Sequence, residues 1–345
     1  MTAPHRSNVD DGALAYTITA VNVANAASVA TVFRSIYGDA FPVQYVYHAD
    51  QVMEEIDAGR LAASLAFNGN GEAIGYVSFY KCAPNPNLWE GGNLVVVPGG
   101  GSDALGWDLM QHYLLPGKLP GPQPDGIIGE AVCHHYFTQV GAVKLGFEEC
   151  GLELDLLDGA SFSEHRPDTE RVACVVQFYE LSDPSDVCYL PEQYLDFLQD
   201  LYGRLRPRTL LPGSLPLPLS GETVSTDHWF EEAGTWRFSV SAIGNDWEQF
   251  LDRMLATCQE RKIVCLQLVI STAMPCISEA VGQLRQRGFF IGGLFPRWFG
   301  NDGVMLQQLF GKEPDYDGIK LYTDVARKML KSIRSDCEAV QRKEK

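Results

Sequence analysis

The sequence predicts an α/β protein with a mixed sheet, built from two halves of similar plan. Apolar runs such as "LAASLAFN" and "AIGYVSFY" predict strands, and segments with helical periodicity such as "AASVATVFRSIY" lie between such runs. The 345 residues are 46% apolar, which is enough for two domains. The segments "KLGFEECGLEL" (144–154) and "QRGFFIGGLFP" (286–296) occupy matching places in the two halves, which indicates a diverged tandem repeat.

The first half, residues 1–182, is expected to contain a strand, two helices, three strands, a helix, a strand, a helix and two strands. A hairpin signal, "GNGE", joins the second and third strands. The expected strands are 16–22, 61–68, 73–80, 88–97, 127–132, 146–157 and 171–181, and the expected helices are 26–37, 48–58, one ending near 115, and 137–145.

The second half, residues 188–345, follows the linker "DPSD" and is expected to repeat part of this plan. A proline-rich segment, "RTLLPGSLPLPLSG", is expected to be a loop. The expected helices are 191–205, 246–261, 276–287 and one from about 318, and the expected strands are 221–228, 235–243, 263–270, 288–299 and 303–310.

The charge and the cysteine pattern narrow the functional class. A net charge of −17 argues against binding to nucleic-acid phosphates and is compatible with a cationic acceptor. No apolar run reaches the roughly 18 residues of a membrane span, and the first residues lack the apolar core of a signal peptide. The nine cysteines include no CxxC pair, so free thiols and a cytoplasmic location are expected.

The stretch "VVVPGGGSDALGWDLMQHYL" (95–114) carries the strongest functional signal. A buried strand ends at a proline, three glycines follow, and a helix begins within a few residues. Three adjacent glycines indicate either a positive φ or a very close approach of another group to the backbone. Free amides at a helix N-terminus also form an anion site, and small residues let phosphate oxygens come near.

This order of elements, with a strand, a glycine loop and a helix at its centre, resembles the GCN5-related N-acetyltransferase (GNAT) fold. The flanking segments "EGGNLVVVP" and "GEAVCHHYFTQVGAVKLGFEECGLEL" strengthen the resemblance, which covers about residues 12–181. The loop pattern Q/R-x-x-G-x-G/A falls on residues 101–106. Gly101 departs from the usual Gln or Arg, and Asp103 places a negative charge near the expected pyrophosphate.

The resemblance implies acetyl-CoA, or another acyl-CoA, as co-substrate. It assigns coenzyme binding to the end of the central strand, the loop and the two following helices. The implied residues are Val96, Val97, Gly101, Ser102, Ala104, Leu105, Gly106 and Gln139. The second half resembles the fold only in plan, so it is expected to be a degenerate copy that binds no coenzyme.

The resemblance also indicates the catalytic groups. Glu90, on the strand before the loop, is expected to be the general base, with Glu130 on the next strand as a second candidate. The usual acid is a Tyr four residues before the Gly of the Gly-Phe turn, where this chain has Ala142, so Tyr136 is proposed instead. The backbone amide near Val96 would stabilise the oxyanion.

Two other segments are candidates for ligand contacts. "CHH" at 133–135 suggests a metal site, but consecutive strand residues point to opposite faces, so no metal is expected. Asp39 and the aromatic residues of "YGDAFPVQYVY" lie where the family shapes its acceptor pocket, or they simply pack between helices.

The sequence therefore predicts an acyl-CoA-dependent N-acetyltransferase that acts on a small-molecule or peptide amine. Its C-terminal half would complete the acceptor site, and neither nucleic acid nor a membrane is expected as partner. One alternative is a non-catalytic module that binds coenzyme or a small ligand. Another is a Fem-like transferase that uses aminoacyl-tRNA, which the net charge of −17 disfavours. The acceptor, the acyl chain and the oligomeric state are left open.

Overall fold

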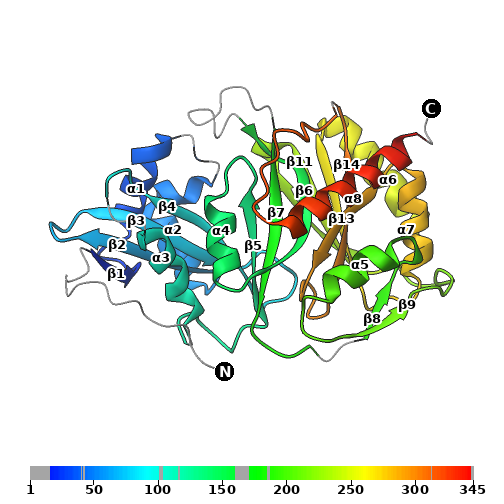
Figure 1. Ribbon diagram of the computed structural model, residues 1–345, viewed down its shortest axis with the longest axis horizontal. Coiled ribbons are helices and arrows are strands. Elements are labelled where there is room, and N and C mark those ends of the chain that lie inside the picture. Colours follow the sequence, from blue (N-terminus) through cyan, green and yellow to red (C-terminus); the bar gives the residue numbers. More distant parts are fainter. Residues whose placement is uncertain are drawn as a thin grey trace. The chain divides into compact units, whose positions relative to one another are not determined.

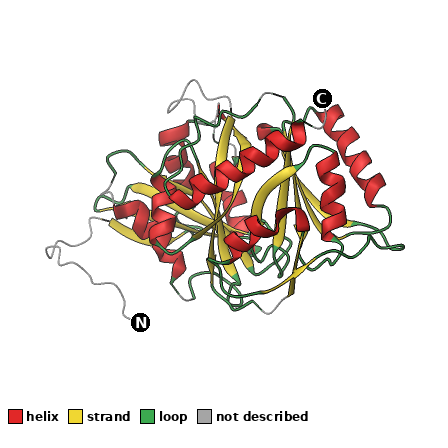
Figure 2. Cartoon of the chain, turned by 45° about the vertical axis from the view of Figure 1, so that its right-hand side comes forward, coloured by secondary structure: helices red, strands yellow, loops and turns green. Residues whose placement is uncertain are grey.

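The fold was analysed in a computed structural model, which describes residues 16–39, 41, 43–100, 104–115, 117–159, 171–184, 187–311 and 313–342 (Figure 1). Figure 2 distinguishes the helices from the strands. The strands are β1 (Tyr16–Ala20), β2 (Leu61–Asn68), β3 (Ala73–Tyr80), β4 (Leu88–Val96), β5 (Gly126–Val132), β6 (Glu148–Asp158), β7 (Arg171–Glu180), β8 (Val187–Leu190), β9 (Thr209–Pro212), β10 (Val224–Phe230), β11 (Thr235–Ala242), β12 (Cys265–Ser271), β13 (Phe290–Phe295) and β14 (Gly303–Leu309). The helices are α1 (Ala27–Tyr37), α2 (Ala49–Asp57), α3 (Ala104–Leu114), α4 (Phe137–Lys144), α5 (Leu195–Tyr202), α6 (Trp247–Arg261), α7 (Ile277–Gln286) and α8 (Asp324–Gln341).

The predicted mixed α/β class is confirmed, because parallel and antiparallel strand pairs occur together with helices that alternate with the strands. The element order predicted for the first half is also found, from β1 through α1, α2, β2, β3, β4, α3, β5 and α4 to β6 and β7. Among the described residues, no helix combines the length and the apolar character needed to cross a membrane.

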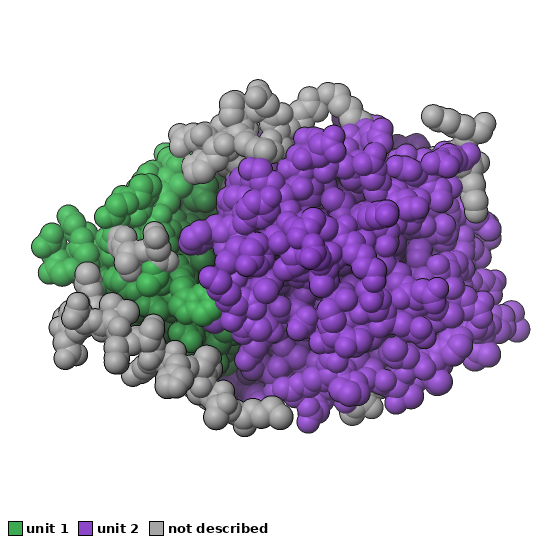
Figure 3. Space-filling model, in the orientation of Figure 1, with its two compact units in different colours: residues 1–79, 93–120 green, residues 80–92, 121–345 purple. Residues whose placement is uncertain are grey.

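The chain divides into two compact units, coloured in Figure 3: residues 1–79 with 93–120, and residues 80–92 with 121–345. The predicted halves 1–182 and 188–345 cut the chain at another place and stay a prediction.

Unit 1 contains strands in the order β1-β2-β3-β4, of which β4 contributes its last residues. Helix α3 is fixed to this sheet by polar contacts. The Tyr16 hydroxyl donates to Asp108 Oδ2 at 2.6 Å, and the hydroxyls of Ser64 and Tyr113 lie 2.9 Å apart. Gly75 permits the close approach, because a Cβ there would lie 2.9 Å from Leu109 Cδ1.

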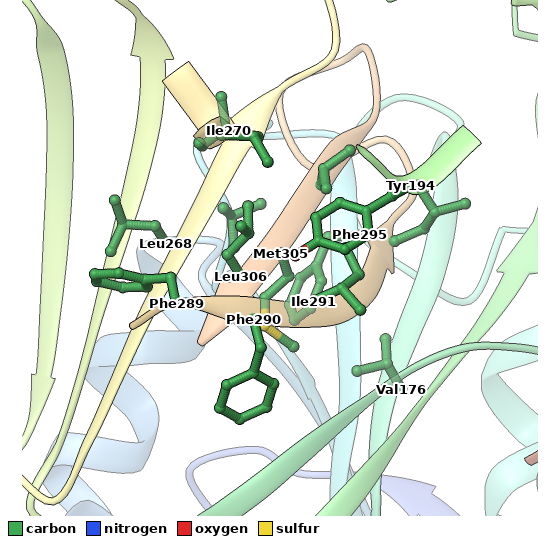
Figure 4. Packing of buried hydrophobic residues seen from close by; sticks show 14 of the residues in the cluster. Val176, Tyr194, Leu268, Ile270, Phe289, Phe290, Ile291, Phe295, Met305 and Leu306 are labelled. Carbon is green, nitrogen blue, oxygen red and sulfur yellow. The ribbon is translucent and has the colours of Figure 1, made fainter. Parts of the chain in front are cut away.

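Unit 2 contains a sheet in the order β4-β5-β7-β6-β13-β14-β12-β11-β10 and a small parallel pair, β8 and β9. Its core gathers around β13, where Phe289, Phe290, Ile291 and Phe295 are at most 2% exposed (Figure 4). Helix α8 lies against β6 and β13 (Figure 1).

The sheet of unit 2 shows the same pairing pattern twice. In the first run β4 pairs with β5 in parallel, β5 pairs with β7 antiparallel, and β7 pairs with β6 antiparallel. In the second run β11 pairs with β12 in parallel, β12 pairs with β14 antiparallel, and β14 pairs with β13 antiparallel. The two runs meet where β6 and β13 pair, at Gly151 and Gly293.

Two details differ from the sequence prediction. Strands β8 and β9 were not expected, because the first adjoins the predicted linker and the second lies within the proline-rich segment, where four-residue strands give little periodicity. The last helix begins at Asp324 rather than near 318. The Thr323 hydroxyl caps it by accepting a hydrogen bond from the Ala326 amide at 3.0 Å.

Candidate active site

Glu90 lies on β4, which places its carboxylate inside unit 2. The preceding residues Leu88 and Trp89 are buried in the core, and Glu90 itself is only 6% exposed. The Tyr80 hydroxyl, at the end of β3, donates a hydrogen bond to Glu90 Oε1. Gly92 leaves room for that ring, because a Cβ at this position would lie 3.1 Å from two of its atoms. Gly92 lies two residues after Glu90 and so on the same face of the strand, and its missing side chain lets Tyr80 reach the carboxylate.

The pairing of strand β4 with β5 ends at Glu90. Its parallel pairing with β5 covers Leu88–Glu90 and Gly126–Ile128, although both strands continue for several described residues. Asn93, the residue directly after Gly91 and Gly92, has φ = +52°, and its side-chain amide donates to Ser78 Oγ at 3.1 Å. A positive φ in a non-glycine strand residue is a local irregularity of the strand. Strand irregularities such as bulges are frequent next to active sites, where they change the direction of side chains.

A buried ionic cluster lies in the same unit and surrounds one arginine. Arg237 on β11 places Nη1 2.9 Å from Glu130 Oε1 and Nη2 2.5 Å from Glu153 Oε1. Its Nε donates to Gln267 Oε1 at 2.7 Å, and Gln267 Nε2 donates to Glu153 Oε1 at 3.0 Å. Arg237 is 4% exposed and Glu153 is fully buried. Glu90 lies opposite Ile128 on the strand that carries Glu130 and interacts electrostatically with Glu130 and Arg237, so both candidate bases belong to this polar interior.

Burial and neighbouring charge bring Glu90 to a useful pKa. Burial of the carboxyl, followed by repulsion from Glu130, raises the pKa of Glu90 to about 7. Hydrogen bonds from Tyr80 and Cys82 and the positive charge of Arg237 act in the opposite direction. A carboxyl with a pKa near 7 is half-deprotonated at neutral pH and can accept a proton there.

Three groups near Glu90 also have raised pKa values. Burial, together with the charge of Glu130, raises the pKa of Glu153 well above its ordinary value. Burial also raises the pKa values of Tyr80 and Cys82 well above theirs.

Two of the three glycines that follow Pro98 have a structural reason. Gly99 has φ = +73°, which favours glycine. A Cβ on Gly100 would lie 2.9 Å from Ile74 Cβ, so a side chain there would clash with β3. The third glycine, Gly101, lies outside the described residues, together with Ser102 and Asp103.

The remaining coenzyme candidates lie at the end of β4 and in α3. Val96 is the last residue of β4, and the Val97 amide already donates to the Ile74 carbonyl at 2.9 Å. Ala104 is the exposed first residue of α3, whereas Leu105 and Gly106 are buried. The first four amides of a helix have no partner within it, so this end of α3 has donors for an anion.

Two candidates on α4 have contrasting surroundings. Tyr136 is the N-cap residue of α4 and is 47% exposed. Gln139 is fully buried: its side-chain nitrogen lies within 3.2 Å of the Val132, His135 and Lys320 carbonyls, and its oxygen accepts from the Tyr322 amide at 3.0 Å. This amide joins the turn before α4 to residues 320–322, and its role in coenzyme binding stays a prediction.

The cysteine–histidine segment is well packed. Cys133 is buried, and the rings of His134 and His135 have their centroids 4.3 Å apart. Among the described residues, no group of three or more His, Cys, Asp or Glu side chains is arranged to hold a metal ion. Asp39 is exposed and pairs with Arg34 at 2.9 Å.

The sequence reasoning found Glu90 and Glu130 but missed Tyr80, Glu153, Arg237 and Gln267. The pairs Trp89–Glu90 and Trp236–Arg237 hold matching positions in the two runs of strands, but this match depends on the strand register and is not visible in the sequence alone. Across β4, β5, β7 and β6, the residues in register with one another are Glu90, Ile128, Phe178 and Glu148. Across β11, β12, β14 and β13, the corresponding residues are Arg237, Gln267, Gln307 and Phe290.

Comparison with known proteins gives structural matches. No family model matches the chain, and no curated protein matches its sequence. An N-acetyltransferase from Staphylococcus aureus Mu50 is similar over 48% of this chain and 99% of its own, at 12% identity and a TM-score of 0.39. NAA60 of Arabidopsis thaliana, solved with a bisubstrate analogue, matches 48% of this chain and 97% of its own, at 12% identity and a TM-score of 0.37.

The third structure is yncA of Salmonella typhimurium, a putative acetyltransferase solved with acetyl-CoA. It matches 50% of this chain and 96% of its own, at 13% identity and a TM-score of 0.40. Two other solved structures that are similar to about half of this chain are named as GNAT proteins, from Sinorhizobium meliloti and Desulfovibrio desulfuricans.

Proposed function

We propose that this protein is an acyl-CoA-dependent N-acyltransferase in which Glu90 is the general base. The observation that carries the proposal is the buried Glu90 carboxylate, with a pKa of about 7, on a strand that leaves its neighbour immediately afterwards. An amine must lose a proton when it attacks a carbonyl, and a base with a pKa near the working pH removes it efficiently.

The residues present are suited to an acyl-CoA substrate. Gly99 and Gly100 keep side chains away from the loop, and Ala104 presents only a methyl group at the exposed start of α3. The first amides of α3 would therefore donate to the pyrophosphate, where the helix dipole also favours negative charge. The bound coenzyme supplies an activated thioester carbonyl.

The proposal gives these roles to residues of this chain. Glu90 takes the proton of the attacking amine, and Tyr80 holds the Glu90 carboxylate by its hydrogen bond. The amide near Val96, on the same strand as Glu90, would stabilise the oxyanion, and Tyr136 would protonate the leaving thiolate. The acceptor is a small-molecule or peptide amine, and the cytoplasm is the expected compartment.

We infer that the second half arose by duplication and does not bind coenzyme. Strands β11 and β12 stay paired over six residues, from Thr235 to Val240, where β4 and β5 pair over three. Only residues 243–246 join β11 to α6, and they contain a single glycine. The counterpart of the glycine loop is thus lacking in this described segment.

A non-catalytic coenzyme-binding protein is the second candidate. Ala142, where the family has its tyrosine acid, favours this alternative, and so does Gly101 in the loop pattern. The first candidate transfers the acyl group to an amine, whereas the second binds the coenzyme without transferring it.

The test combines binding with turnover. Titration calorimetry with acetyl-CoA measures binding, and release of the free thiol in the presence of a panel of amines measures transfer. Glu90→Gln should bind acetyl-CoA normally while kcat falls by about 10²–10⁴-fold. Glu149→Gln is the matched control, because Glu149 is also a buried strand carboxyl but hydrogen-bonds to Thr323, away from the cluster. Binding without turnover on any amine would favour the second candidate, and absence of binding would contradict both.

A further inference from the structure

Arg237 belongs to the C-terminal half but lies in the same interior as the candidate base. Its guanidinium contacts Glu130, Glu153 and Gln267 through three different nitrogens. The rings of Phe230, Phe295 and Trp298 surround it, with centroids 5.3 to 5.7 Å from its Cζ. These contacts fix both the charge and its direction, since a planar guanidinium bound through several nitrogens has little freedom to rotate.

The position of Arg237 is the counterpart of the position of Glu90. Each residue follows a buried tryptophan on the strand that precedes a helix, and each is opposite the third residue of the adjacent parallel strand. One half therefore contributes a carboxylate, and the other contributes a guanidinium of opposite charge at the same place in the repeat.

We propose that Arg237 is a positioning residue: by holding Glu130 and Glu153 in a fixed ionic cluster, the C-terminal half sets the pH range in which Glu90 can accept a proton. The inference rests on the proposed function of Glu90 as general base and assigns the degenerate half a regulatory role in that same site.

The cluster contains more negative than positive groups, and Arg237 compensates part of this negative charge. Three carboxyl groups share this interior with one guanidinium, so the cluster carries two excess negative charges when every group is ionised. Like charges at short distance in a buried site disfavour ionisation of one another. Without Arg237, deprotonation of Glu90 would add a charge beside an uncompensated Glu130.

The other titratable groups around the cluster come from several elements. Tyr80 ends β3, and Cys82 lies two residues after it. His228 lies on β10, and burial, followed by the charge of Arg237, lowers the pKa of its imidazole. None of these groups carries a positive charge near pH 7 that could replace the guanidinium, since Tyr80 and Cys82 are neutral and His228 is shifted toward its neutral form.

The first experiment is the pH profile of kcat/KM for four forms of the full-length protein. In Arg237→Met the acidic limb should move to higher pH by about one pH unit or more, because an attracting charge is lost. In Glu130→Gln it should move to lower pH, because a repelling charge is lost. The double variant should lie between the two. Arg237→Lys should keep the limb near that of the wild type but lower kcat, because it retains the charge without the planar fork.

The second experiment measures Glu90 directly and does not depend on turnover. The side-chain carboxyl carbon of Glu90, labelled with ¹³C-glutamate and assigned from Glu90→Gln, is titrated by NMR in the same variants. Opposite displacements of this titration in Arg237→Met and Glu130→Gln would support the proposal even if no amine were acetylated. Should Arg237→Met fail to fold, the double variant, which removes both members of the ion pair, and Glu130→Gln still provide the comparison.

A purely structural arginine predicts another outcome. The variants would then lose thermal stability, while the Glu90 titration and the acidic limb would stay at the wild-type pH. That result would overturn the proposed role of Arg237 and leave Glu90 as the base.

Discussion

Gly151 and Gly293 are paired directly across β6 and β13, and they hold the same position in the two halves of the chain. Gly293 has φ = +143°, and a Cβ there would lie 2.3 Å from Gly151 Cα and 2.4 Å from the Cys150 carbonyl oxygen. The strands can approach each other at this point only because both residues lack side chains.

Gly293→Ala is therefore expected to destabilise the protein by about 3 kcal/mol or more, since backbone must move in a close-packed core. Urea denaturation measures the change. Gly151→Ala should cost less, because its Cβ would lie 3.0 Å from the Gly292 carbonyl oxygen. Gly282→Ala, inside α7 with its nearest neighbour at 3.5 Å, is the control and should be neutral or stabilising. Equal losses for Gly293 and Gly282 would contradict the close contact.

Gln307 is a buried link between β14 and β6. Its side chain accepts from the Leu154 amide and donates to the Leu152 carbonyl, both at 2.9 Å. Gln307→Leu should leave these two buried backbone groups without partners, at about 1–3 kcal/mol each. The neighbouring Gln308→Leu loses a single bond to the Arg287 carbonyl and should cost less. Chemical denaturation measures the loss of stability in both variants. A smaller loss in Gln307→Leu than in Gln308→Leu would contradict the role of the two Gln307 hydrogen bonds.

The start of α3 provides a test of coenzyme binding that separates affinity from stability. Ala104→Glu places a negative charge at the helix N-terminus, which favours the helix but repels a pyrophosphate. We expect acetyl-CoA to bind at least about tenfold more weakly while the melting temperature is unchanged or higher. Ala104→Gln is the uncharged control of the same shape. Unchanged affinity in calorimetry would place the pyrophosphate away from α3. This position is preferable to the buried Gly106, where a larger side chain would also disturb packing.

Calorimetry with acetyl-CoA should give one site per chain. The first half has the glycine loop, whereas β11 and β12 remain paired over six residues and lead into α6 through residues 243–246. A stoichiometry of two would show that the second half opens to admit a coenzyme.

The buried Glu90 makes the stability depend on pH in a defined direction. Burial raises its pKa to about 7 from an ordinary 4.5, so the folded state binds this proton more tightly than the unfolded state. The resulting stabilisation is complete below pH 4.5 and is lost as the pH rises through 7. Glu90→Gln lacks this dependence, so its stability relative to the wild type should rise by about 3 kcal/mol between pH 4 and pH 8. Parallel stability–pH curves for the two proteins would contradict a raised pKa.

The sequence allowed most of the first half to be predicted, because its strands and helices have strong periodicity and clear breaks. Glu90 could be proposed from the resemblance to the GNAT fold, and Glu130 because it is flanked by apolar residues on the next strand. Arg237, Glu153 and Gln267 could not, because the contacts among them join β6, β11 and β12, which are distant in the chain. Local patterns do not report which buried polar side chains meet. The register equivalence of Trp89–Glu90 and Trp236–Arg237 becomes visible only once the strand partners are known.

The pairing at Gly151 has a consequence for the history of the chain. Strand β6 has β7 on one side and β13 on the other, and its Leu152, Glu153 and Leu154 are fully buried. A protein that ended near residue 182 would present this strand as a bare, apolar edge, which is a template for aggregation. Deletion of the C-terminal half would therefore be selected against for solubility alone, so its strands would be retained even if that half binds no coenzyme, as we propose.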